Sequence, residues 1–393
     1  MSGVQIICTM AAAPALFAGV YLLLLTLASR RTSAPPLLDL PLRFTIVVPA
    51  HNEARGIAET VKNLRALAWP PERFRVLVLA DNCSDDTANR ARAAGAQVIE
   101  RIDRANRGKG YALQLAFDHL LGQGWADAMV VVDADTLVSP NLLRAFAAQI
   151  GAGAQAVQAD YRVRNVDDAW RTRLMAIAFG AFHTERSLAR ERLGLSCGLR
   201  GNGMCFTAGT LRAVPHLAFS LVEDLEYGLR LGEAGVRVHH AVDAQVFGEM
   251  VAGERASRSQ RLRWERGRRA LARTRGPTLL ARALVKRSAL LLDLAIDLLL
   301  PPLASLALYS ALGLIAALMF GGGALAIDAF SFTLFAIALH VVRGWQLSGT
   351  GARGLADLLR APVYLLWKLG LALRRPTQRP TSWVRTARGG ESP

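Results

Sequence analysis

The chain has 393 residues, of which 52% are hydrophobic, and 47 basic against 31 acidic residues leave a formal net charge of +16. This length accommodates one domain of about 200–250 residues with further segments attached, and the hydrophobic content is typical of a membrane protein. The charge alone does not indicate a nucleic-acid partner, because no DNA- or RNA-binding motif occurs. The basic residues are densest at 255–275, close to apolar segments, where anionic lipid accounts for them. We therefore expect membrane lipid and no nucleic acid among the partners.

The first apolar segment, residues 5–28, carries no charge and is followed by Arg30 and Arg31. A stretch of this length spans about 30 Å of hydrocarbon, so we predict a transmembrane helix within residues 1–30. A cleaved signal peptide is the alternative. It is disfavoured because the segment lacks a basic start and a convincing cleavage site.

Two further apolar stretches, 288–320 and 324–342, follow the more polar middle of the chain. The first contains two aspartates and a Pro-Pro pair, so its start is predicted to be interfacial or kinked, with a span at about 298–320. The region 288–343 then holds about two spans. Basic residues flank the segments, and the positive-inside rule places residues 30–287 and the C-terminus in the cytoplasm. The prediction is a multi-pass protein of the cell (inner) membrane with three crossings and an outside N-terminus.

The last part of the chain, residues 354–393, mixes apolar residues with Asp357, Arg360 and Lys368 before a basic tail. This pattern predicts an amphipathic helix at 354–373 on the membrane surface, followed by a cytoplasmic tail. A fourth crossing is the alternative. The four cysteines have no metal-ligand spacing, so neither a disulfide nor a structural zinc is expected.

Between residues 41 and 275, short apolar runs alternate with segments of helical character. This pattern is typical of an α/β domain with a mostly parallel sheet. The predicted strands cover 44–49, 76–80, 97–99, 129–132, 154–160 and 237–242, and the predicted helices cover 54–67, 84–94, 108–121, 141–150 and 225–233.

Acidic residues follow two of the predicted strands. Asp81 comes directly after the run 76–80, and Asp133 and Asp135 form one tight turn after the run 129–132. Ligands of open α/β sheets bind beyond the carboxyl ends of the strands, so these carboxylates are expected to face one crevice. Two acids in one turn repel each other unless a cation lies between them, and Mg²⁺ or Mn²⁺ held together with substrate phosphates meets that need. A solvated turn with an Asx cap is the alternative.

Two further strings border the same predicted crevice. Residues 49–53 read Pro-Ala-His-Asn-Glu and end the first strand, where Glu53 is placed to accept hydrogen bonds from a nucleobase or ribose and His51 either stacks on the base or packs. Lys109 lies in the string Asn-Arg-Gly-Lys-Gly at a predicted helix start, which resembles a phosphate cradle but lacks the Walker A sequence. The predicted nucleotide contacts are Pro49, His51, Glu53, Asp81, Lys109 and Asp133.

The later part of the domain carries two more candidate strings. Glu223 and Asp224 open a predicted helix, where the helix dipole alone favours acids. In the functional interpretation, Asp224 is a general base that removes the proton from a hydroxyl. Gln260, Arg263 and Trp264 share roughly one face of another predicted helix, where Arg is suited to clamp a diphosphate and an indole to stack on a sugar ring. The alternative is an amphipathic helix resting on the membrane.

The order of these motifs (a single Asp, D-x-D, Glu-Asp and Q-x-x-R-W) resembles the membrane-integrated family-2 glycosyltransferases, particularly their cellulose-synthase-like branch. The resemblance covers residues 44 to about 268. It implies a Rossmann-like GT-A fold and a nucleotide-sugar donor, most often a UDP-sugar. By this resemblance the nucleobase and ribose contact Glu53 and Asp81, and the diphosphate contacts Lys109. The nucleotide and the metal are held by Asp133 and Asp135, and Asp224 is the catalytic base. The residues that border the diphosphate and the acceptor are Glu223, Gln260, Arg263 and Trp264.

The activity implied is an inverting, metal-dependent hexosyl transfer to a saccharide or lipid-linked saccharide, in exopolysaccharide or cell-envelope glycan synthesis. One segment departs from the family pattern. A Cys-Gly-containing string usually precedes the catalytic acid, whereas residues 196–204 here read Ser-Cys-Gly-Leu-Arg-Gly-Asn-Gly-Met. The acceptor and any export partners therefore stay open. The alternatives are transfer of one sugar to a polyprenyl phosphate or another lipid, and a non-catalytic membrane scaffold that binds nucleotide sugar.

Overall fold

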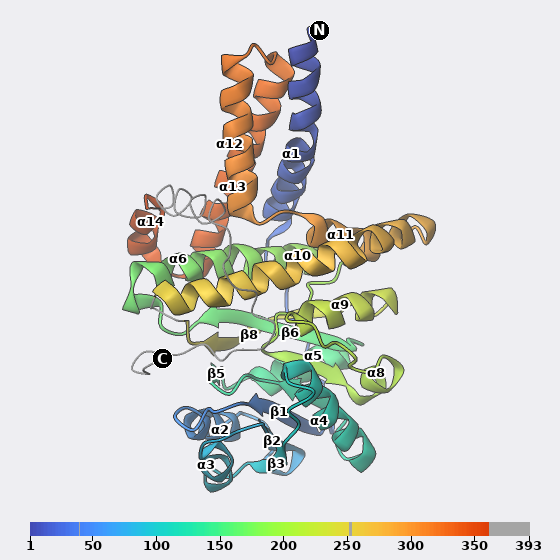
Figure 1. Cartoon of the computed structure of the whole chain (residues 1–393). Coiled ribbons are helices and arrows are strands. Elements are labelled where there is room, and N and C mark those ends of the chain that lie inside the picture. Colours follow the sequence, from blue (N-terminus) through green and yellow to red (C-terminus); the bar gives the residue numbers. More distant parts are fainter. Residues whose placement is uncertain (39, 251–253, 361–393) are drawn as a thin grey trace. The chain divides into compact units, whose positions relative to one another are not determined.

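The computed structural model describes residues 1–38, 40–250 and 254–360, and for residues 254–261 it describes the backbone alone. The chain divides into two compact units (Figure 1). Unit 1 comprises Met1–Arg30, Ala169–Leu193 and the described chain from Leu299 onwards, and unit 2 comprises Arg31–Asp168 and Gly194–Leu298. Every residue predicted to form the site belongs to unit 2.

Unit 2 is built on one mixed sheet of eight strands in the order β3-β2-β1-β4-β7-β6-β8-β5. The strands β3, β2, β1 and β4 run parallel to their neighbours, as do β6 and β8, whereas β7 is antiparallel to β4 and β6, and β5 is antiparallel to β8. The predicted α/β fold is confirmed. The strand bounds are β1 Phe44–Ala50, β2 Phe74–Asp81, β3 Gln97–Arg101, β4 Ala128–Val131, β5 Thr136–Val138, β6 Ala156–Val163, β7 Met204–Thr207 and β8 Val238–Gly248.

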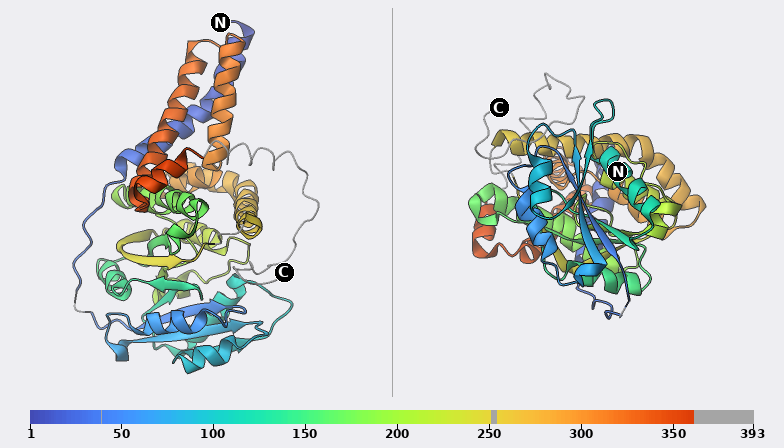
Figure 2. Two further views of the ribbon diagram at one scale, coloured as in Figure 1. Left: turned by 90° about the vertical axis from the view of Figure 1, so that its left-hand side faces the viewer. Right: turned by 90° about the horizontal axis from the view of Figure 1, so that it is seen from below.

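Helices cover both faces of this sheet, which is why its central strands β1, β2 and β4 are continuous apolar runs with few exposed positions. One apolar core joins the sheet to α2 (Ile57–Arg65), α3 (Thr87–Ala93) and α5 (Leu142–Gly151). A second core on the other face joins it to α4 (Lys109–Gln123), α8 (Ala208–Ala213) and α9 (Glu223–Glu233). The views in Figure 2 show the helices of the first half on either side of the strands.

Two more helices of unit 2 pack against α9. They are α10 (Glu254–Val285), a single helix of 32 residues, and α11 (Ala289–Leu299). A Cβ at Gly267 of α10 would come within 2.8 Å of Val222 Cγ1, so only glycine permits this close approach. The helix that carries Arg263 is thereby held against the start of α9.

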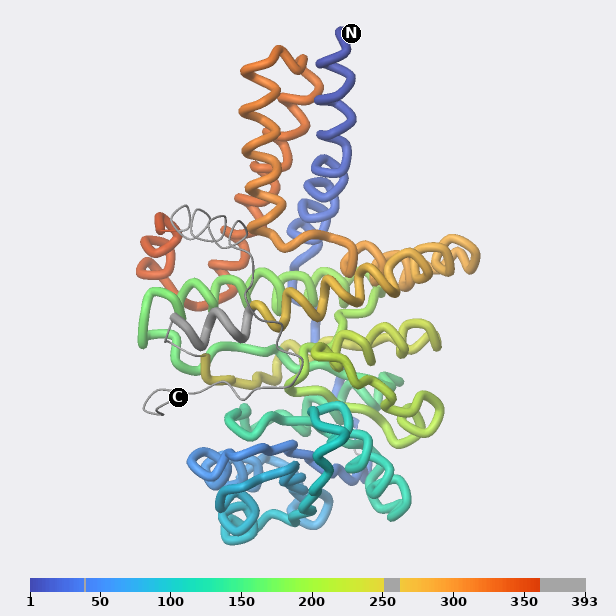
Figure 3. Tube along the Cα trace, viewed as in Figure 1, coloured from blue at the N-terminus to red at the C-terminus, as the bar shows by residue number. Residues whose placement is uncertain are grey.

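In unit 1 the helices α1 (Gly3–Ala28), α12 (Leu303–Met319) and α13 (Ala324–Ser348) run side by side (Figure 3). A helical segment from the middle of the chain joins them: α6 (Trp170–Phe179), a π-helix (Gly180–Glu185) and α7 (Arg186–Arg192). A Cβ at Gly180 would lie 2.2 Å from the Gly344 carbonyl oxygen, so this segment and α13 meet backbone to backbone. Glu185 Oε1 accepts a hydrogen bond from Thr26 Oγ1 at 2.7 Å and lies 2.7 Å from His340 Nδ1. The last described helix is α14 (Gly351–Leu358).

The predicted apolar helices at both ends of the chain are confirmed. In the described part of the chain α1 and α13 are each long and apolar enough to cross a membrane, and the bent pair of α11 and α12 is a third candidate if it counts as one span. α13 continues to Ser348, so Arg343 lies within it rather than after it, and Arg343 Nη2 donates to the Ser29 carbonyl at 2.9 Å. The number of crossings, their orientation and the inner membrane stay predictions. Most of the predicted interfacial helix at 354–373, and the tail after it, lie outside the described residues.

Several elements differ from those expected. The strands β5 and β7 and the helices α6, α7 and α8 were not predicted, and β6 and β8 end later than expected, at Val163 and Gly248. β5 and β7 have only three and four residues, too few for a recognisable alternation. Both β5 and β7 are antiparallel to their neighbours, which makes the sheet mixed.

Candidate active site

Three strands of the parallel half end at one edge of the sheet. β1 ends at Ala50, β2 at Asp81 and β4 at Val131, so the segments that follow emerge together. His51 Nδ1 lies 2.7 Å from the Asp81 carbonyl oxygen, which joins the ends of β1 and β2 directly. The structure thus brings Asp81, His51 and the Asp133 turn to the same edge of the sheet, as expected for an open α/β sheet.

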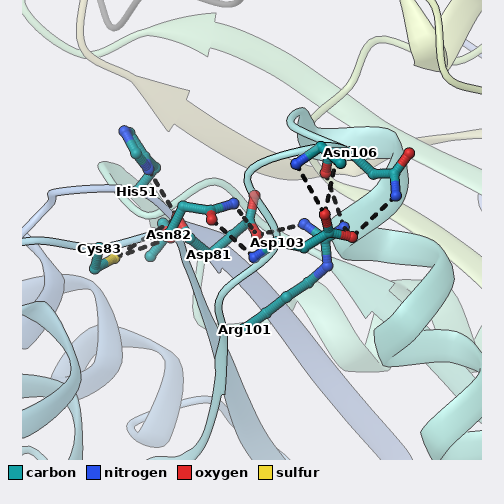
Figure 4. Close-up of polar contacts among 9 residues, drawn as sticks. His51, Asp81, Asn82, Cys83, Arg101, Asp103 and Asn106 are labelled. Carbon is teal, nitrogen blue, oxygen red and sulfur yellow. Dashed lines mark hydrogen bonds and ion pairs between the residues drawn. The ribbon is translucent and has the colours of Figure 1, made fainter.

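Asp81 lies in a network of polar side chains around the end of β3 (Figure 4). Arg101 Nη1 donates to Asp81 Oδ1 at 2.6 Å, and its Nη2 donates to Asp103 Oδ2 at 2.8 Å. Asp103 Oδ1 in turn accepts the backbone N–H groups of Ala105 and Asn106. Burial raises the pKa of Asp81, and the ion pair with Arg101 opposes that shift.

Arg101 was not among the predicted site residues. Its side chain is only 10% exposed, and that of Asp81 only 11%. The available signal was its position, since Arg101 ends a strand next to one that ends in an acid. An arginine at the end of a short polar strand otherwise looks like an exposed residue, which is why the sequence alone did not single it out.

The remaining predicted nucleotide contacts border this edge. Pro49 lies in β1 opposite Leu79 of β2, one residue before the strand ends. The backbone N–H of Glu53 donates to Thr87 Oγ1 at 2.8 Å, which fixes the segment after β1 against the start of α3. Both residues therefore stand on the edge of the sheet that the sequence predicted for them.

Lys109, the first residue of α4, joins the two halves of the site. Its Nζ donates to Asp133 Oδ1 and to the Gly201 carbonyl, and it lies 3.8 Å from Glu223 Oε1. Burial alone would lower the pKa of Lys109, but the negative charges of Asp133 and Glu223 outweigh it and the pKa is raised. Lys109 therefore carries its positive charge at neutral pH.

Asp133 and Asp135 lie in a turn closed by the Thr136 N–H, which donates to the Asp133 carbonyl at 3.2 Å. Among the described residues, no three His, Cys, Asp or Glu side chains converge on one point as a complete metal site would need. Two carboxylates at the edge of a sheet nevertheless suit Mg²⁺ or Mn²⁺, because such ions complete their shells with water and substrate phosphates. The donor set therefore fits a metal that arrives with a phosphorylated ligand.

Glu223 and Asp224 are the first two residues of α9. Burial raises the pKa of Glu223 to about 7 and also raises that of Asp224, although Lys109 opposes both shifts. A helix N-terminus stabilises negative charge, but here the cost of removing the carboxylates from water is larger. A Cβ on Gly201 would lie 3.2 Å from Asp224 Oδ2, so the segment before β7 closes one side of this acid.

Of the string on α10, Arg263 has a defined environment. Its Nε is buried and has no hydrogen-bond partner among the described residues, while its charge interacts with Glu223 and Asp133. Burial lowers the pKa of this guanidinium. A buried N–H without an acceptor is costly, so this group is suited to an anionic ligand. Trp264 is half-buried, and the side chain of Gln260 lies outside the described residues.

The family model described as Glycosyltransferase like family 2 matches residues 41–267, more than half of the chain, and the chain belongs to this family. The chain is 25% identical over 240 residues to the probable glycosyltransferase YdaM of Bacillus subtilis, covering 58% of this chain and 56% of that protein. It is 28% identical over 231 residues to a beta-monoglucosyldiacylglycerol synthase of Synechocystis, covering 56% and 47% respectively.

These matches cover about half the length of the two curated relatives. Among solved structures, a mannosyltransferase from Pyrobaculum calidifontis in complex with GDP-Man and Mn²⁺ is similar over 93% of this chain and 98% of that one, with a TM-score of 0.55 and 19% identity. At that identity the similarity is one of fold. It confirms the GT-A architecture expected from the order of the motifs.

Proposed function

We propose that this chain is an inverting, metal-dependent glycosyltransferase that transfers a hexosyl group to a saccharide or lipid-linked saccharide. The proposed donor is a nucleotide sugar, and among these a UDP-sugar. The observation that carries the proposal is the convergence, in unit 2, of Asp133, Lys109, Glu223 and Arg263 beside Asp224. Such a transfer needs positive charge beside the diphosphate of the donor and a carboxylate that accepts the proton of the acceptor hydroxyl.

The donor half of the proposal rests on Asp81, Lys109 and Asp133. The nucleoside would lie along the ends of β1 and β2, where Glu53 and Asp81 offer acceptors for its polar groups. The diphosphate would lie near Lys109 and Arg263, whose charges offset the negative charge that grows on it as the sugar leaves. A divalent cation held by Asp133 and Asp135 would add positive charge at the same phosphates.

The acceptor half rests on Asp224. As the base it would take the proton of an acceptor hydroxyl while the oxygen attacks the anomeric carbon. A single displacement of this kind inverts the anomeric configuration. The raised pKa suits the role, because a carboxylate that binds protons more tightly is a stronger base.

The acceptor is proposed to be a saccharide or a lipid that carries one, as in the cellulose-synthase-like branch that the Gln260–Trp264 string resembles. A lipid acceptor itself is the second candidate. It is favoured by the apolar helices of unit 1 and by the relative whose name is that of a glucosyldiacylglycerol synthase. We place the protein in the inner membrane with unit 2 in the cytoplasm, where nucleotide sugars are found.

A donor panel tests the proposal. The full chain in detergent, supplied with Mn²⁺ or Mg²⁺ and a membrane-lipid extract, is offered UDP-, GDP- and dTDP-sugars, and nucleoside diphosphate release is measured. Metal-dependent release from one donor, with a glycosylated product, supports the proposal and names the acceptor class. Binding without release leaves the scaffold alternative, and the absence of binding to every donor contradicts the proposal.

A further inference from the structure

A second polar network lies directly beneath the candidate site, and none of the proposed roles uses it. It consists of Gln158, the third residue of β6, and Asn202, in the loop before β7. Both side chains are buried, with exposures of 1% and 0%. Buried amides are costly unless every polar atom is paired, so the direction of their hydrogen bonds shows what they hold in place.

Gln158 supports the loop of residues 196–203 from the sheet. Its Nε2 donates to the Asn202 carbonyl at 2.7 Å and to the Ala159 carbonyl at 2.9 Å, and its Oε1 accepts the backbone N–H of Arg200 at 2.9 Å. One side-chain amide thus fixes the loop at two backbone positions, Arg200 and Asn202, on either side of the glycine that faces Asp224.

Asn202 continues the network into the metal-binding turn. Its Oδ1 accepts the backbone N–H of Asp133 at 3.1 Å, and its Nδ2 donates to Thr136 Oγ1 at 2.7 Å. These two bonds hold both ends of the four-residue turn that presents the Asp133 and Asp135 carboxylates. The turn is therefore fixed by a side chain that is distant in sequence.

The residue between these two anchor points touches the other functional groups. The Gly201 carbonyl accepts a hydrogen bond from Lys109 Nζ, and its Cα faces Asp224 so closely that a Cβ would lie 3.2 Å from Oδ2. Its φ of +78° is a conformation that residues with a side chain rarely adopt. Three consecutive residues, 200–202, thus lie against the base, the lysine and the metal-binding turn.

We propose that Gln158 and Asn202 are positioning residues, which hold the Asp133–Thr136 turn and the Gly201 carbonyl in one register so that the donor-binding charges and Asp224 face a common point. This inference rests on the proposed function. A purely structural role would make these amides equivalent to any other buried amide that bonds to the backbone. Positioning instead requires that their loss alter ligand binding more than it alters stability.

The chain offers a matched control. Asn63 of α2, which is partly exposed, likewise makes two hydrogen bonds, both to the backbone of Val138: it accepts the Val138 N–H at 2.8 Å and donates to the Val138 carbonyl at 3.3 Å. These bonds hold Val138, the last residue of β5, and neither of them reaches the Asp133–Thr136 turn. Asn202→Ala and Asn63→Ala therefore remove a similar number of bonds from the same region of the sheet.

The test compares these two variants with the unmodified full chain in detergent. UDP and GDP binding in the presence of Mn²⁺ is measured by calorimetry, Tm by differential scanning fluorimetry, and backbone exchange by hydrogen–deuterium mass spectrometry. We expect Asn202→Ala to weaken nucleotide binding about tenfold or more, the size expected when a buried hydrogen-bonding group is left unpaired, and Asn63→Ala to weaken it less than about twofold. Gln158→Met should weaken binding less than Asn202→Ala while increasing exchange in residues 198–203.

Hydrogen exchange keeps the inference testable without a ligand. Residues 132–136 should exchange faster in Asn202→Ala than in Asn63→Ala, even where the two variants have the same Tm. Equal nucleotide affinity in the two variants, or equal exchange at 132–136, would overturn the inference. If the unmodified chain binds neither nucleotide, the proposed function fails, and the exchange comparison still decides whether Asn202 holds the turn.

Discussion

The acids at the ends of the parallel strands and the acids at the start of α9 are held in different ways. Asp81 and Asp133 each contact a cation directly, Arg101 in one case and Lys109 in the other. The two acids of α9 share that lysine from a greater distance, 3.8 Å for Glu223, and burial raises the pKa of both. Burial also raises the pKa of Asp81, but there an ion pair at 2.6 Å opposes it.

In the proposed function, this difference corresponds to two tasks, donor binding by the acids at the strand ends and proton transfer by an acid of α9. An acid in direct contact with a cation is a fixed point for a ligand, whereas a buried acid with a raised pKa, such as Asp224, suits the proton transfer proposed for it. The two environments occur in one site because the acids come from different elements. Asp81 and Asp133 follow strands, whereas Glu223 and Asp224 begin a helix.

The largest loss of nucleotide binding is expected when Asp133, at the end of β4, is substituted. Asp133→Asn removes both the partner of Lys109 and a proposed metal ligand, so Mn²⁺-dependent nucleotide binding should weaken about 100-fold. Calorimetric titration with UDP and GDP measures this. Asp118→Asn, at an exposed position of α4, is the control and should bind as the unmodified chain does. Unchanged affinity in Asp133→Asn would remove this carboxylate from the donor site.

A smaller loss is expected when Asp81 loses its cation. Arg101→Met leaves a buried carboxylate without its ion pair, so the KM for the donor should rise about tenfold while kcat changes less than about twofold. Arg92→Met provides the matched control, because its ion pair with Glu100 is exposed, with side chains 46% and 55% accessible. A fall in kcat with an unchanged KM would mean that Arg101 acts on the chemical step instead.

The smallest effect concerns stability and pH at Glu223. Burial raises the pKa of Glu223 from 4.5 to about 7, so the folded chain binds a proton that the unfolded chain has released between those values. The contribution of Glu223 to the stability of the fold is therefore fully present below its unfolded pKa of 4.5. It is lost as pH rises through its folded pKa of about 7. Glu223→Gln cannot ionise and escapes this decline.

The measurement is Tm against pH for the two proteins. From about pH 5 to about pH 8, the Tm of the unmodified chain should fall relative to that of Glu223→Gln, by about 2–4 °C for each kcal/mol in a domain of about 200 residues. Curves that stay parallel over this range would show that Glu223 is ionised throughout.

The sequence predicted the surroundings of the strand-end acids Asp81 and Asp133 more fully than those of Glu223 and Asp224 at the start of α9. Asp81 and Asp133 each follow an uninterrupted apolar run, and such a run places its last residue at the edge of a parallel sheet without further information. The predicted strands and helices of this half match β1 to β4 and α2 to α5 in order and type.

The sequence could not predict features that depend on contacts between distant segments. Arg101, Gln158 and Asn202 are polar residues in or beside strands, and only the folded register shows that they contact Asp81, the 196–203 loop and the Asp133 turn. The raised pKa of Glu223 is likewise a property of burial, which neighbouring residues in the sequence do not reveal. The short β5 and β7 were missed because three or four residues show no period.

If the strand-end acids bind the donor and Asp224 takes the proton, a single substitution at Asp224 should separate nucleotide binding from turnover. Asp224→Asn keeps the size of the side chain and all the strand-end acids. It should bind the donor nucleotide with Mn²⁺ within about threefold of the unmodified chain, while nucleoside diphosphate release falls about 10²–10⁴-fold, the contribution of a general base. Loss of binding together with turnover, or turnover that survives the substitution, would contradict the division between the strand ends and α9.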